Sequence, residues 1–386
     1  MFSSRTRWDR AQNRLSALLE RRRQAGGDVV DLTVSNPTEV GLQAPDEVLA
    51  LLGDAQGAAY APDPRGLASA REAVAADFAR RGHAVGAERL VLCASTSEAY
   101  AWLFKLLADP GDNVLVPRPS YPLFEFLADL ESISTRSYPL AYDGAWHVDL
   151  AAVEEAIRPR TRAIVVVNPN NPTGSFVSST EAHRLQGLCA RRGLALVSDE
   201  VFADFGEEPD PSRVTSFAGD GPALAFALGG LSKSCGLPQL KLGWIAVSGP
   251  PELRDEALAR LEIVADTYLS VSTPVQRALP DILARLPKLQ APIAARVKRN
   301  RGALRERFVA SSATLLAADG GWSAVLQVPA TLPEEQRVLR LLERDGVLVH
   351  PGFFFDFPRE AYLVVSLLPR PADFDRGTAR LLADVL

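Results

Sequence analysis

Two lysines lie in a short stretch of otherwise small and apolar residues. Lys233 and Lys241 belong to the segment GGLSKSCGLPQLKLG, which runs from Gly229 to Gly243 between two apolar runs. An ammonium group is costly to bury, so most lysines keep it in solvent. A desolvated lysine has a lowered pKa and becomes an amine nucleophile, which is the basis of Schiff-base chemistry. Because small neighbours leave space for a second molecule, we interpret Lys233 as a candidate nucleophile.

Asp199 and Asn171 extend this chemistry, each at the end of another apolar run. Asp199 closes LALVSD, and Asn171 lies in VVVNPNNPTG. A cofactor that serves as an electron sink needs a carboxylate on its ring nitrogen and a lysine on its aldehyde. Taken separately, Asp199 fits a helix cap and NPNNPTG fits a plain turn, since Asn, Pro and Gly are turn residues. Their occurrence together with Lys233 favours a cofactor site.

The elements that would position these residues alternate along the chain between apolar runs and amphipathic helical patterns. Such alternation indicates an α/β fold with a mainly parallel sheet that is covered on both faces. In sheets of this kind the functional residues collect at the carboxyl ends of the strands. The predicted strands are 88–96, 113–117, 161–169, 194–201, 223–230 and 242–249, and the predicted helices between them are 97–108, 121–130 and 179–192.

The pattern changes after Pro250. Helical spacing covers residues 251–308, and short alternating strands (WSAVLQV, VLVHPG and YLVVSLL) then precede a closing helix near 374–385. This α+β pattern predicts a second, smaller lobe that the N-terminal helix joins. We therefore expect a large α/β domain over residues 45–265 and a small α+β domain that combines residues 1–44 with residues 266–386.

Composition and charge exclude several classes of partner. A formal net charge of −5 gives no reason to expect nucleic acid or an anionic membrane. The three cysteines and four histidines are dispersed, so neither a disulfide framework nor a metal site is predicted. No apolar run approaches the roughly 18 residues of a membrane helix. No secretory signal is visible, and we expect a cytoplasmic protein.

Two phosphate-binding motifs also fail to account for Lys233. A P-loop requires a glycine directly before its lysine, whereas Ser232 stands there. The glycine-rich dinucleotide fingerprint is absent as well. The segment DVVDLTVSNP (28–37) predicts a short strand before those given above, and it continues into TVSNPT without a glycine triplet. The lysine is therefore not explained by either nucleotide-binding motif.

Three motifs in order resemble those of the fold-type-I, class I/II pyridoxal-phosphate-dependent aminotransferases. They are NPNNPTG (168–174), SDEVF (198–202) and LSKSCGLPQLKLGW (231–244). The segments YAPDPRGLASAREAVA, DPGDNVLVPRPSYPLF and PGFFF also fit, so the resemblance extends over most of the chain. It implies a mainly parallel seven-stranded sheet flanked by helices, a smaller α+β domain, and pyridoxal 5'-phosphate as the cofactor.

The resemblance also implies roles around the cofactor ring. Lys233 would bind the cofactor's aldehyde covalently and then move the proton at the substrate's Cα. Asp199 would keep the ring nitrogen protonated, which lets the ring accept the carbanion's charge. Asn171 would donate a hydrogen bond to the phenolic oxygen. Tyr121 would stack on one face of the ring, and Val201 would pack on the other.

The phosphate of the cofactor would have its own group of residues. Ser95 and Thr96 enter a predicted helix, whose N-terminal N–H groups would bind the anion. Ser232 would assist them, and Lys241 occupies the place of an arginine that binds the phosphate in the family. Tyr60 would reach the phosphate of the neighbouring subunit, which implies a homodimer with shared active sites.

Four positions depart from the family's pattern. Lys241 keeps the positive charge of the usual arginine but lacks its bidentate fork. Gly230 replaces a serine, and Phe202 replaces a tyrosine whose phenol would stabilise the cofactor's ring oxygen as an anion. Val364 stands where an arginine usually holds the substrate's α-carboxylate. We expect Arg370, the nearest arginine in sequence, to compensate; otherwise the carboxylate is held differently or is absent.

The predicted function is amino transfer between an amino acid and a 2-oxo acid, by a ping-pong cycle of the cofactor. The same lysine and aspartate serve lyases, decarboxylases and racemases, and Val364 keeps these alternatives open. A third interpretation is a cofactor-binding module without turnover, although the sequence has no basic stripe through which such a module would regulate DNA. The sequence does not identify the substrate.

Overall fold

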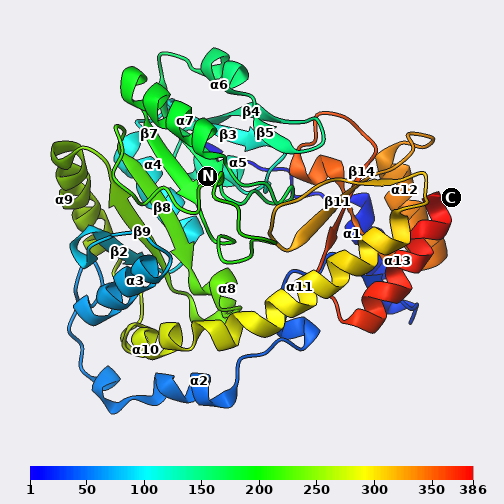
Figure 1. Ribbon diagram of the computed structural model, residues 1–386, viewed down its shortest axis with the longest axis horizontal. Coiled ribbons are helices and arrows are strands. Elements are labelled where there is room, and N and C mark those ends of the chain that lie inside the picture. The colour runs from blue at the N-terminus through cyan, green and yellow to red at the C-terminus, as the bar shows by residue number, and fades with distance from the viewer. Residues whose placement is uncertain (386) are drawn as a thin grey trace.

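The computed structural model describes residues 1–385, and one large sheet forms its left half in Figure 1. Five adjacent strands of this sheet are parallel, while its ends contain antiparallel pairs. The predicted α/β class with a mainly parallel sheet is thus confirmed. Within the described residues the strand order is β2 (Leu90–Cys93), β9 (Gly243–Ser248), β8 (Ala225–Gly230), β7 (Ala195–Asp199), β6 (Thr161–Val167), β3 (Asn113–Arg118), β4 (Ser134–Tyr142) and β5 (Trp146–Val148).

The large sheet has eight strands across residues 1–385, so the expected number of seven is wrong for this chain. The edge strand β5 folds back on β4 and pairs Val148 with Leu140 and Trp146 with Tyr142. Strand β4 mixes exposed and buried residues, because it lies near the edge of the sheet. Neither strand has the continuous apolar run that marks a strand buried on both faces.

Helices cover both faces of the large sheet. The pleat sends neighbouring residues to opposite faces, so that Val165 and Ile164 of β6 belong to different cores. The first face packs on α4 (Thr96–Leu107), α5 (Phe124–Leu130) and α9 (Pro251–Tyr268). The second face packs on α3 (Ala68–Arg80), α6 (Leu150–Ala156), α7 (Ser179–Arg192) and α10 (Thr273–Ala284).

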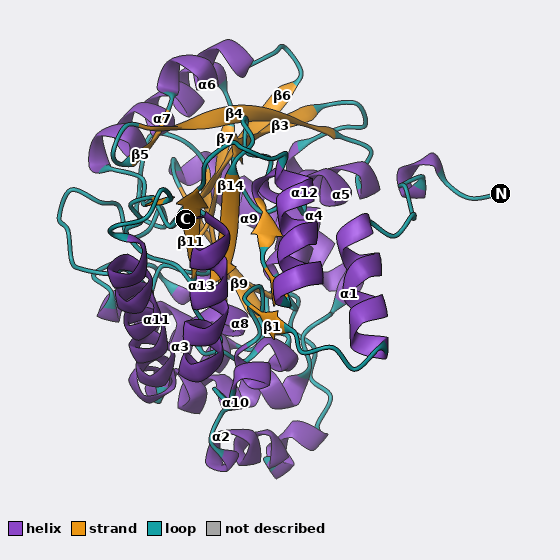
Figure 2. Ribbon diagram, turned by 90° about the vertical axis from the view of Figure 1, so that its right-hand side faces the viewer, coloured by secondary structure: helices purple, strands orange, loops and turns teal. Residues whose placement is uncertain are grey.

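The second lobe contains a smaller antiparallel sheet, whose strands β11 and β14 are labelled in Figure 2. Its order is β10 (Thr314–Leu315), β11 (Ser323–Gln327), β14 (Tyr362–Ser366) and β13 (His350–Pro351). A separate parallel pair joins β1 (Val30–Asp31) to β12 (Val347–Leu348), so the N-terminal segment belongs to this lobe. The helices of the lobe are α1 (Arg14–Gln24), α11 (Leu286–Phe308), α12 (Glu334–Arg340) and α13 (Pro371–Val385).

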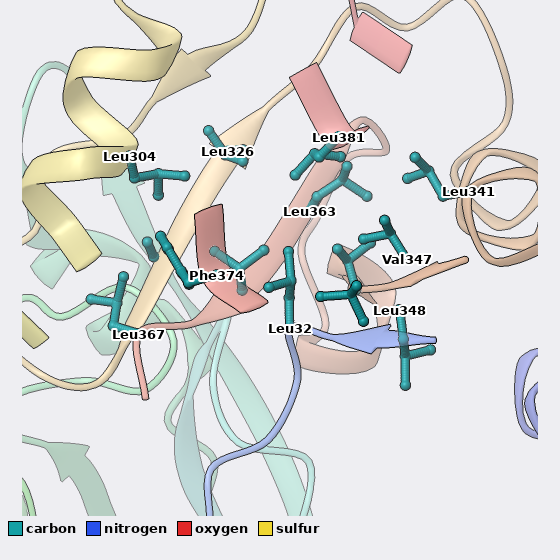
Figure 3. Packing of buried hydrophobic residues seen from close by; sticks show 14 of the residues in the cluster. Leu32, Leu304, Leu326, Leu341, Val347, Leu348, Leu363, Leu367, Phe374 and Leu381 are labelled. Carbon is teal, nitrogen blue, oxygen red and sulfur yellow. The ribbon is translucent and has the colours of Figure 1, made fainter. Parts of the chain in front are cut away.

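The small lobe has its own apolar core, which Figure 3 shows from close by. Leu32 lies beside β1, Leu304 comes from α11, and Leu363 comes from β14. Phe374 and Leu381 complete the core from α13, about two helical turns apart. Because these residues come from both ends of the chain, the small lobe forms only when the N-terminal segment and the last helix meet.

None of the described helices combines the length and apolarity that crossing a bilayer requires. The remaining helical segments are short. Besides α2 (Asp46–Ala50) and α8 (Leu231–Ser234), they are 3-10 turns at Ser4–Thr6, Pro37–Val40, Leu51–Gly53, Ala55–Ala58, Ala87–Arg89, Pro238–Leu240 and Gly352–Phe355, and a π-helical turn at Leu341–Asp345.

We propose that the chain divides into the two domains expected from its sequence, residues 45–265 and residues 1–44 with 266–386. The separate cores of the large sheet and the small sheet support this division. Helix α11 runs from the large sheet to the small lobe in Figure 1 and would connect the two. Within this division α10 packs on α3 of the large domain, so the beginning of the second segment stays with the large sheet.

Candidate active site

The carboxyl ends of several strands meet at one edge of the large sheet. Strands β6, β7 and β8 are adjacent and parallel, and they lead to Asn171, Asp199 and Lys233. Strand β2 runs in the same direction as β8, because the antiparallel β9 lies between them, and it leads to Ser95 at the start of α4. The topology therefore brings these four predicted site residues to the same edge.

Lys233 lies half-buried beside two aromatic rings. Its Nζ is 5.3 Å from the ring centroid of Trp322 and 5.7 Å from that of Phe202. Burial lowers the pKa of Lys233, because desolvation disfavours the charged amine, while the negative charge of Asp199 acts in the opposite direction. The side chain thus has a larger neutral fraction than an exposed lysine, as an amine nucleophile requires.

Asp199 is held by two hydrogen-bond donors. The Val201 N–H donates to Oδ1 at 3.2 Å, and the Tyr100 hydroxyl donates to Oδ2 at 3.2 Å. Burial raises the pKa of Asp199 to about 6, and the two donors and Lys233 act against this rise. A cation placed against this carboxylate would favour its ionised form. The environment therefore suits a protonated ring nitrogen.

Asn171 is oriented by a residue of the small lobe. The hydroxyl of Ser323, at the start of β11, donates to Asn171 Oδ1 at 3.2 Å. Because Oδ1 of Asn171 accepts this bond, its Nδ2 group remains as a hydrogen-bond donor for a ligand. The other asparagines of the motif are buried and structural: Asn168 accepts from the Val177 N–H at 2.9 Å, and Asn170 bonds within its own turn. Among the three, Asn171 is the one that is not fully buried.

The N-terminus of α4 opens at this edge of the sheet. Ser95 is its N-cap and accepts from the Glu98 N–H at 3.1 Å, and Thr96 is the first helical residue. Both residues are half-buried. The Glu98 carboxylate accepts from the Ala94 N–H at 2.6 Å, so this backbone donor is already engaged. The free N–H groups of the first turn remain to favour an anion.

The glycine at position 230 is explained by the close approach of two strands. A Cβ on Gly230 would lie 3.0 Å from Gly243 Cα and 3.1 Å from Leu242 O. A Cβ on Gly243 would in turn lie 2.9 Å from Gly229 O. These neighbours are backbone atoms, which cannot rotate away. A side chain at position 230 would therefore be tightly packed, and the backbone of β9 would have to shift by a few tenths of an ångström to admit it.

The other predicted cofactor residues are more exposed to solvent. Ser232 is half-buried directly before Lys233. Lys241 is exposed in the left-handed region, with φ of 51°, and makes no hydrogen bond or ion pair with another residue of 1–385. Tyr121 is 50% exposed just before α5. Tyr60 is 80% exposed and lines a surface pocket with Leu269. Tyr60 is thus not grouped with Lys233 inside one protomer.

The donor chemistry at this edge fits pyridoxal phosphate. The cofactor needs an amine for its aldehyde, a carboxylate for its ring nitrogen and a donor for its ring oxygen. Lys233, Asp199 and Asn171 are of these types, and each remains partly accessible where its strand neighbours are buried. The open N-terminus of α4 and the unpaired Lys241 suit a phosphate.

The residue in place of the carboxylate-binding arginine is apolar and buried. Val364 is 1% exposed and pairs with Val325 on the face of the small sheet that also carries Ser323. It packs with Phe355 and Phe357, so no cation occupies this position. The exposed Arg370 lies elsewhere: its Nη2 would be 3.4 Å from a Cβ on Gly41. Its expected compensating role stays a prediction.

Three residues of the site escaped prediction from the sequence. Tyr100 lies one turn beyond Thr96 on α4, and helical spacing would have placed it on the same face. Ser323 and Trp322 come from the small lobe, more than a hundred residues from Asn171 along the chain. No local pattern in the sequence connects them to the strand ends.

Replacing Phe202 with tyrosine should shift the visible-absorbance transition of the cofactor-loaded protein to lower pH. A phenol at this position would donate to the cofactor's ring oxygen and stabilise its anion. We expect a shift of about one pH unit, measured by absorbance titration. Phe205→Tyr is the matched control, because Phe205 is also buried and also packs on Trp322. Equal transitions in the two variants would refute the assignment.

The fold and the site together define a class of protein. A mainly parallel α/β sheet with a lysine, a carboxylate and a helix start at one edge is consistent with a pyridoxal-phosphate-dependent enzyme. The sequence pattern of the family "Aminotransferase class I and II" matches residues 27–372, which is most of the chain. The chain therefore belongs to this family, which uses pyridoxal phosphate.

Two relatives of similar sequence have names that describe different activities, an aminotransferase and a lyase. The glutamate-pyruvate aminotransferase AlaA of Escherichia coli is 31% identical over 270 residues, 68% of this chain and 65% of that protein. The S-alkyl-thiohydroximate lyase of Arabidopsis thaliana is 32% identical over 253 residues, 64% of this chain and 54% of that protein. The matched region thus spans somewhat less than two thirds of each relative's length.

Solved structures share the fold across the whole chain. The alanine aminotransferase of Pyrococcus furiosus superposes with a TM-score of 0.90 and 22% sequence identity, covering 99% of both chains. This likeness includes the small lobe as well as the large sheet. The predicted membership of the class I/II aminotransferase family is therefore confirmed by sequence, and the fold is confirmed by structure.

Proposed function

We propose that this protein is an aminotransferase that moves an amino group between an amino acid and a 2-oxo acid in two half-reactions. The observation that carries the proposal is the desolvated amine of Lys233 at the same sheet edge as Asp199 and Asn171. Family membership and the named glutamate-pyruvate relative support amino transfer. Small 2-amino acids such as glutamate and alanine are the first donors to test.

Each residue of the site has a separate task in this proposal. Pyridoxal phosphate, when bound, supplies an aldehyde for the amino group and a ring that accepts electrons from the substrate. The Nζ of Lys233 would take the proton from the substrate's Cα and pass it to the cofactor. The Asp199 carboxylate holds a proton at the ring nitrogen, and Asn171 Nδ2 donates to the ring oxygen. Phe202 and Trp322 exclude water from one side of Nζ.

Single-turnover experiments test the reaction type. The cofactor-loaded protein is mixed with one amino acid at a time, and the cofactor spectrum, 2-oxo acid and ammonia are followed. Amino transfer yields one equivalent of 2-oxo acid per site, keeps the nitrogen on the cofactor and releases no ammonia. A spectrum that stays unchanged with a wide panel of amines would reject turnover and leave a cofactor-binding module.

A lyase on the same scaffold is the second candidate. Two observations favour it: Val364 removes the usual cation for the α-carboxylate, and one relative is an S-alkyl-thiohydroximate lyase. In the same experiment a lyase would release ammonia and a 2-oxo acid from substrates that carry a leaving group. The lyase proposal is rejected if such substrates give only the stoichiometric product of amino transfer.

Arg370→Ala should raise the KM for amino acids if Arg370 binds the substrate's carboxylate. Arg370 makes no ion pair with another residue of 1–385, and its neighbour Arg296 donates to the carbonyls of Val40 and Leu368 rather than to a carboxylate. Loss of a hydrogen bond to a charged group corresponds to about a 10- to 100-fold rise in KM. Lys298→Ala, an exposed cation on the same helix as Arg296, is the control. Matching KM values in both variants would end this assignment.

We propose that two copies of the chain form a homodimer in which Tyr60 of each reaches the phosphate of the other. Its 80% exposure leaves it accessible to a partner. Leu269, an exposed apolar residue directly after α9, lines the same surface pocket as Tyr60. Sedimentation velocity of the full chain decides the point, since a monomer at micromolar concentration contradicts shared sites.

A further inference from the structure

The buried hydroxyl of Tyr100 contacts Asp199 and has no role in the mechanism proposed above. Tyr100 is 3% exposed and lies on α4, the same helix whose N-terminus faces the phosphate site. Its ring is fixed by Phe124 at 5.3 Å, edge to face, and by Phe104 at 5.9 Å. The hydroxyl donates to Asp199 Oδ2 at 3.2 Å. A ring held in this way points its hydroxyl at one acceptor.

We propose that Tyr100 is the positioning residue that holds Asp199 ionised and aimed at the cofactor's ring nitrogen. Tyr100 donates to one carboxylate oxygen and the Val201 N–H donates to the other, so each oxygen keeps lone pairs for a third donor. The inference rests on the proposed function, because it assigns Asp199 to the ring nitrogen. It adds a residue that determines how firmly the proton stays at that nitrogen.

The strength of this effect follows from the burial of the carboxylate. Burial raises the pKa of Asp199 to about 6, while the donors Val201 N–H and Tyr100 and the charge of Lys233 lower it. Lys233 on α8 is the charged group that faces the carboxylate, and Tyr138 on β4 is the titratable group that faces Tyr100. Removal of the Tyr100 donor raises the pKa of Asp199 further, so that less of the carboxylate is ionised at neutral pH.

A tyrosine that serves only the core would behave differently, and the chain contains one. Tyr138 is 1% exposed on β4, and its hydroxyl donates to Val165 O at 2.7 Å. Tyr138→Phe removes one buried hydroxyl and one hydrogen bond, as Tyr100→Phe does, and it leaves the contacts of Asp199 intact. The two substitutions therefore match in size, burial and chemistry, and they differ in the acceptor that loses its donor.

The experiment uses the full chain loaded with pyridoxal phosphate labelled with ¹⁵N at the ring. The ¹⁵N chemical shift, followed against pH, reports directly whether the ring nitrogen carries a proton. We expect Tyr100→Phe to move this transition down by about one pH unit and to weaken cofactor binding about tenfold. Tyr138→Phe should leave both values at those of the wild type while lowering the melting temperature by a similar amount.

The outcomes separate the inference from the proposed function. If the wild type transfers amino groups but Tyr100→Phe titrates like Tyr138→Phe, the role of Tyr100 is overturned and the function stands. If the wild type takes up no pyridoxal phosphate, both fail. Should Tyr100→Phe not fold, incorporation of 3-fluorotyrosine at position 100 gives the opposite test. Its more acidic phenol is a stronger donor and should move the ring-nitrogen transition upward, and an unmoved transition overturns the proposal.

Discussion

Lys233→Ala is expected to lower kcat for amino transfer by about 10³- to 10⁴-fold, the contribution of a positioned acid–base group. Its Nζ is the amine that faces Asp199, and its burial keeps a neutral fraction available. Without Nζ no group in place can take the proton from the substrate's Cα. Stopped-flow measurement of the cofactor spectrum during one half-reaction gives the rate directly.

The other lysine of the same segment is the natural comparison. Lys241 is exposed and unpaired, and we assign it to the phosphate rather than to the chemistry. Lys241→Ala should weaken cofactor binding about tenfold and leave the rate of the loaded enzyme close to that of the wild type. Borohydride should fix the cofactor covalently to this variant but not to Lys233→Ala. Covalent fixation of the cofactor in Lys233→Ala would show that another residue is the nucleophile.

Asp199→Asn should have the second largest effect, a loss of about 10²- to 10³-fold in kcat. This is the usual cost of removing one preorganised electrostatic partner of a developing charge. The amide keeps the size of the carboxyl group. Its oxygen can still accept from the Val201 N–H, and its Nδ2 can donate to the Tyr100 hydroxyl, so that the local structure is retained. What it loses is the negative charge that keeps a proton at the ring nitrogen. Single-turnover rates with a good donor measure the loss.

The same substitution predicts a pH dependence. The pKa of Asp199 is raised to about 6, so the carboxyl group is ionised above that pH and neutral below it. The advantage of the wild type over Asp199→Asn in cofactor affinity is therefore largest above pH 6, and it should shrink by up to about tenfold per pH unit below pH 6. Fluorescence titrations of the cofactor-free proteins between pH 5 and pH 8 measure this ratio.

Glu200→Gln is the control for burial in this experiment. Glu200 is the next residue, it is 6% exposed, and burial raises its pKa to about 7. Its carboxylate accepts from the Phe217 N–H at 2.7 Å. Glu200→Gln should alter the melting temperature without changing the pH profile of cofactor binding. A profile that changes equally in both variants would assign the effect to the fold rather than to Asp199.

The strand ends of the site were predictable because a parallel sheet imposes one rule on all of them. Continuous apolar runs identified β6, β7 and β8, and the carboxyl ends of such strands share an edge. Asn171, Asp199 and Lys233 follow these runs in sequence, so their grouping required no knowledge of side-chain packing. The resemblance to a family then supplied roles for residues that spacing alone left undefined, such as Ser95.

The features that escaped prediction depend on contacts between distant elements. Strand β4 is half exposed at the edge of the sheet, and its mixed pattern does not distinguish it from a loop. Ser323 meets Asn171 only because the small sheet packs against the large one. Tyr100 reaches Asp199 because of the orientation of α4 on the sheet, and this orientation cannot be predicted from the sequence of the helix alone.

The close approach of β8 and β9 limits how this protein can be redesigned. Serine at position 230 would bring a further hydroxyl toward the phosphate, but its Cβ would meet backbone atoms of Leu242 and Gly243 at 3.1 and 3.0 Å. These backbone atoms would have to shift by a few tenths of an ångström, beside the turn that presents Lys233. Position 241 is the less crowded place to engineer tighter retention of the cofactor, because its exposed side chain has space for a forked cation.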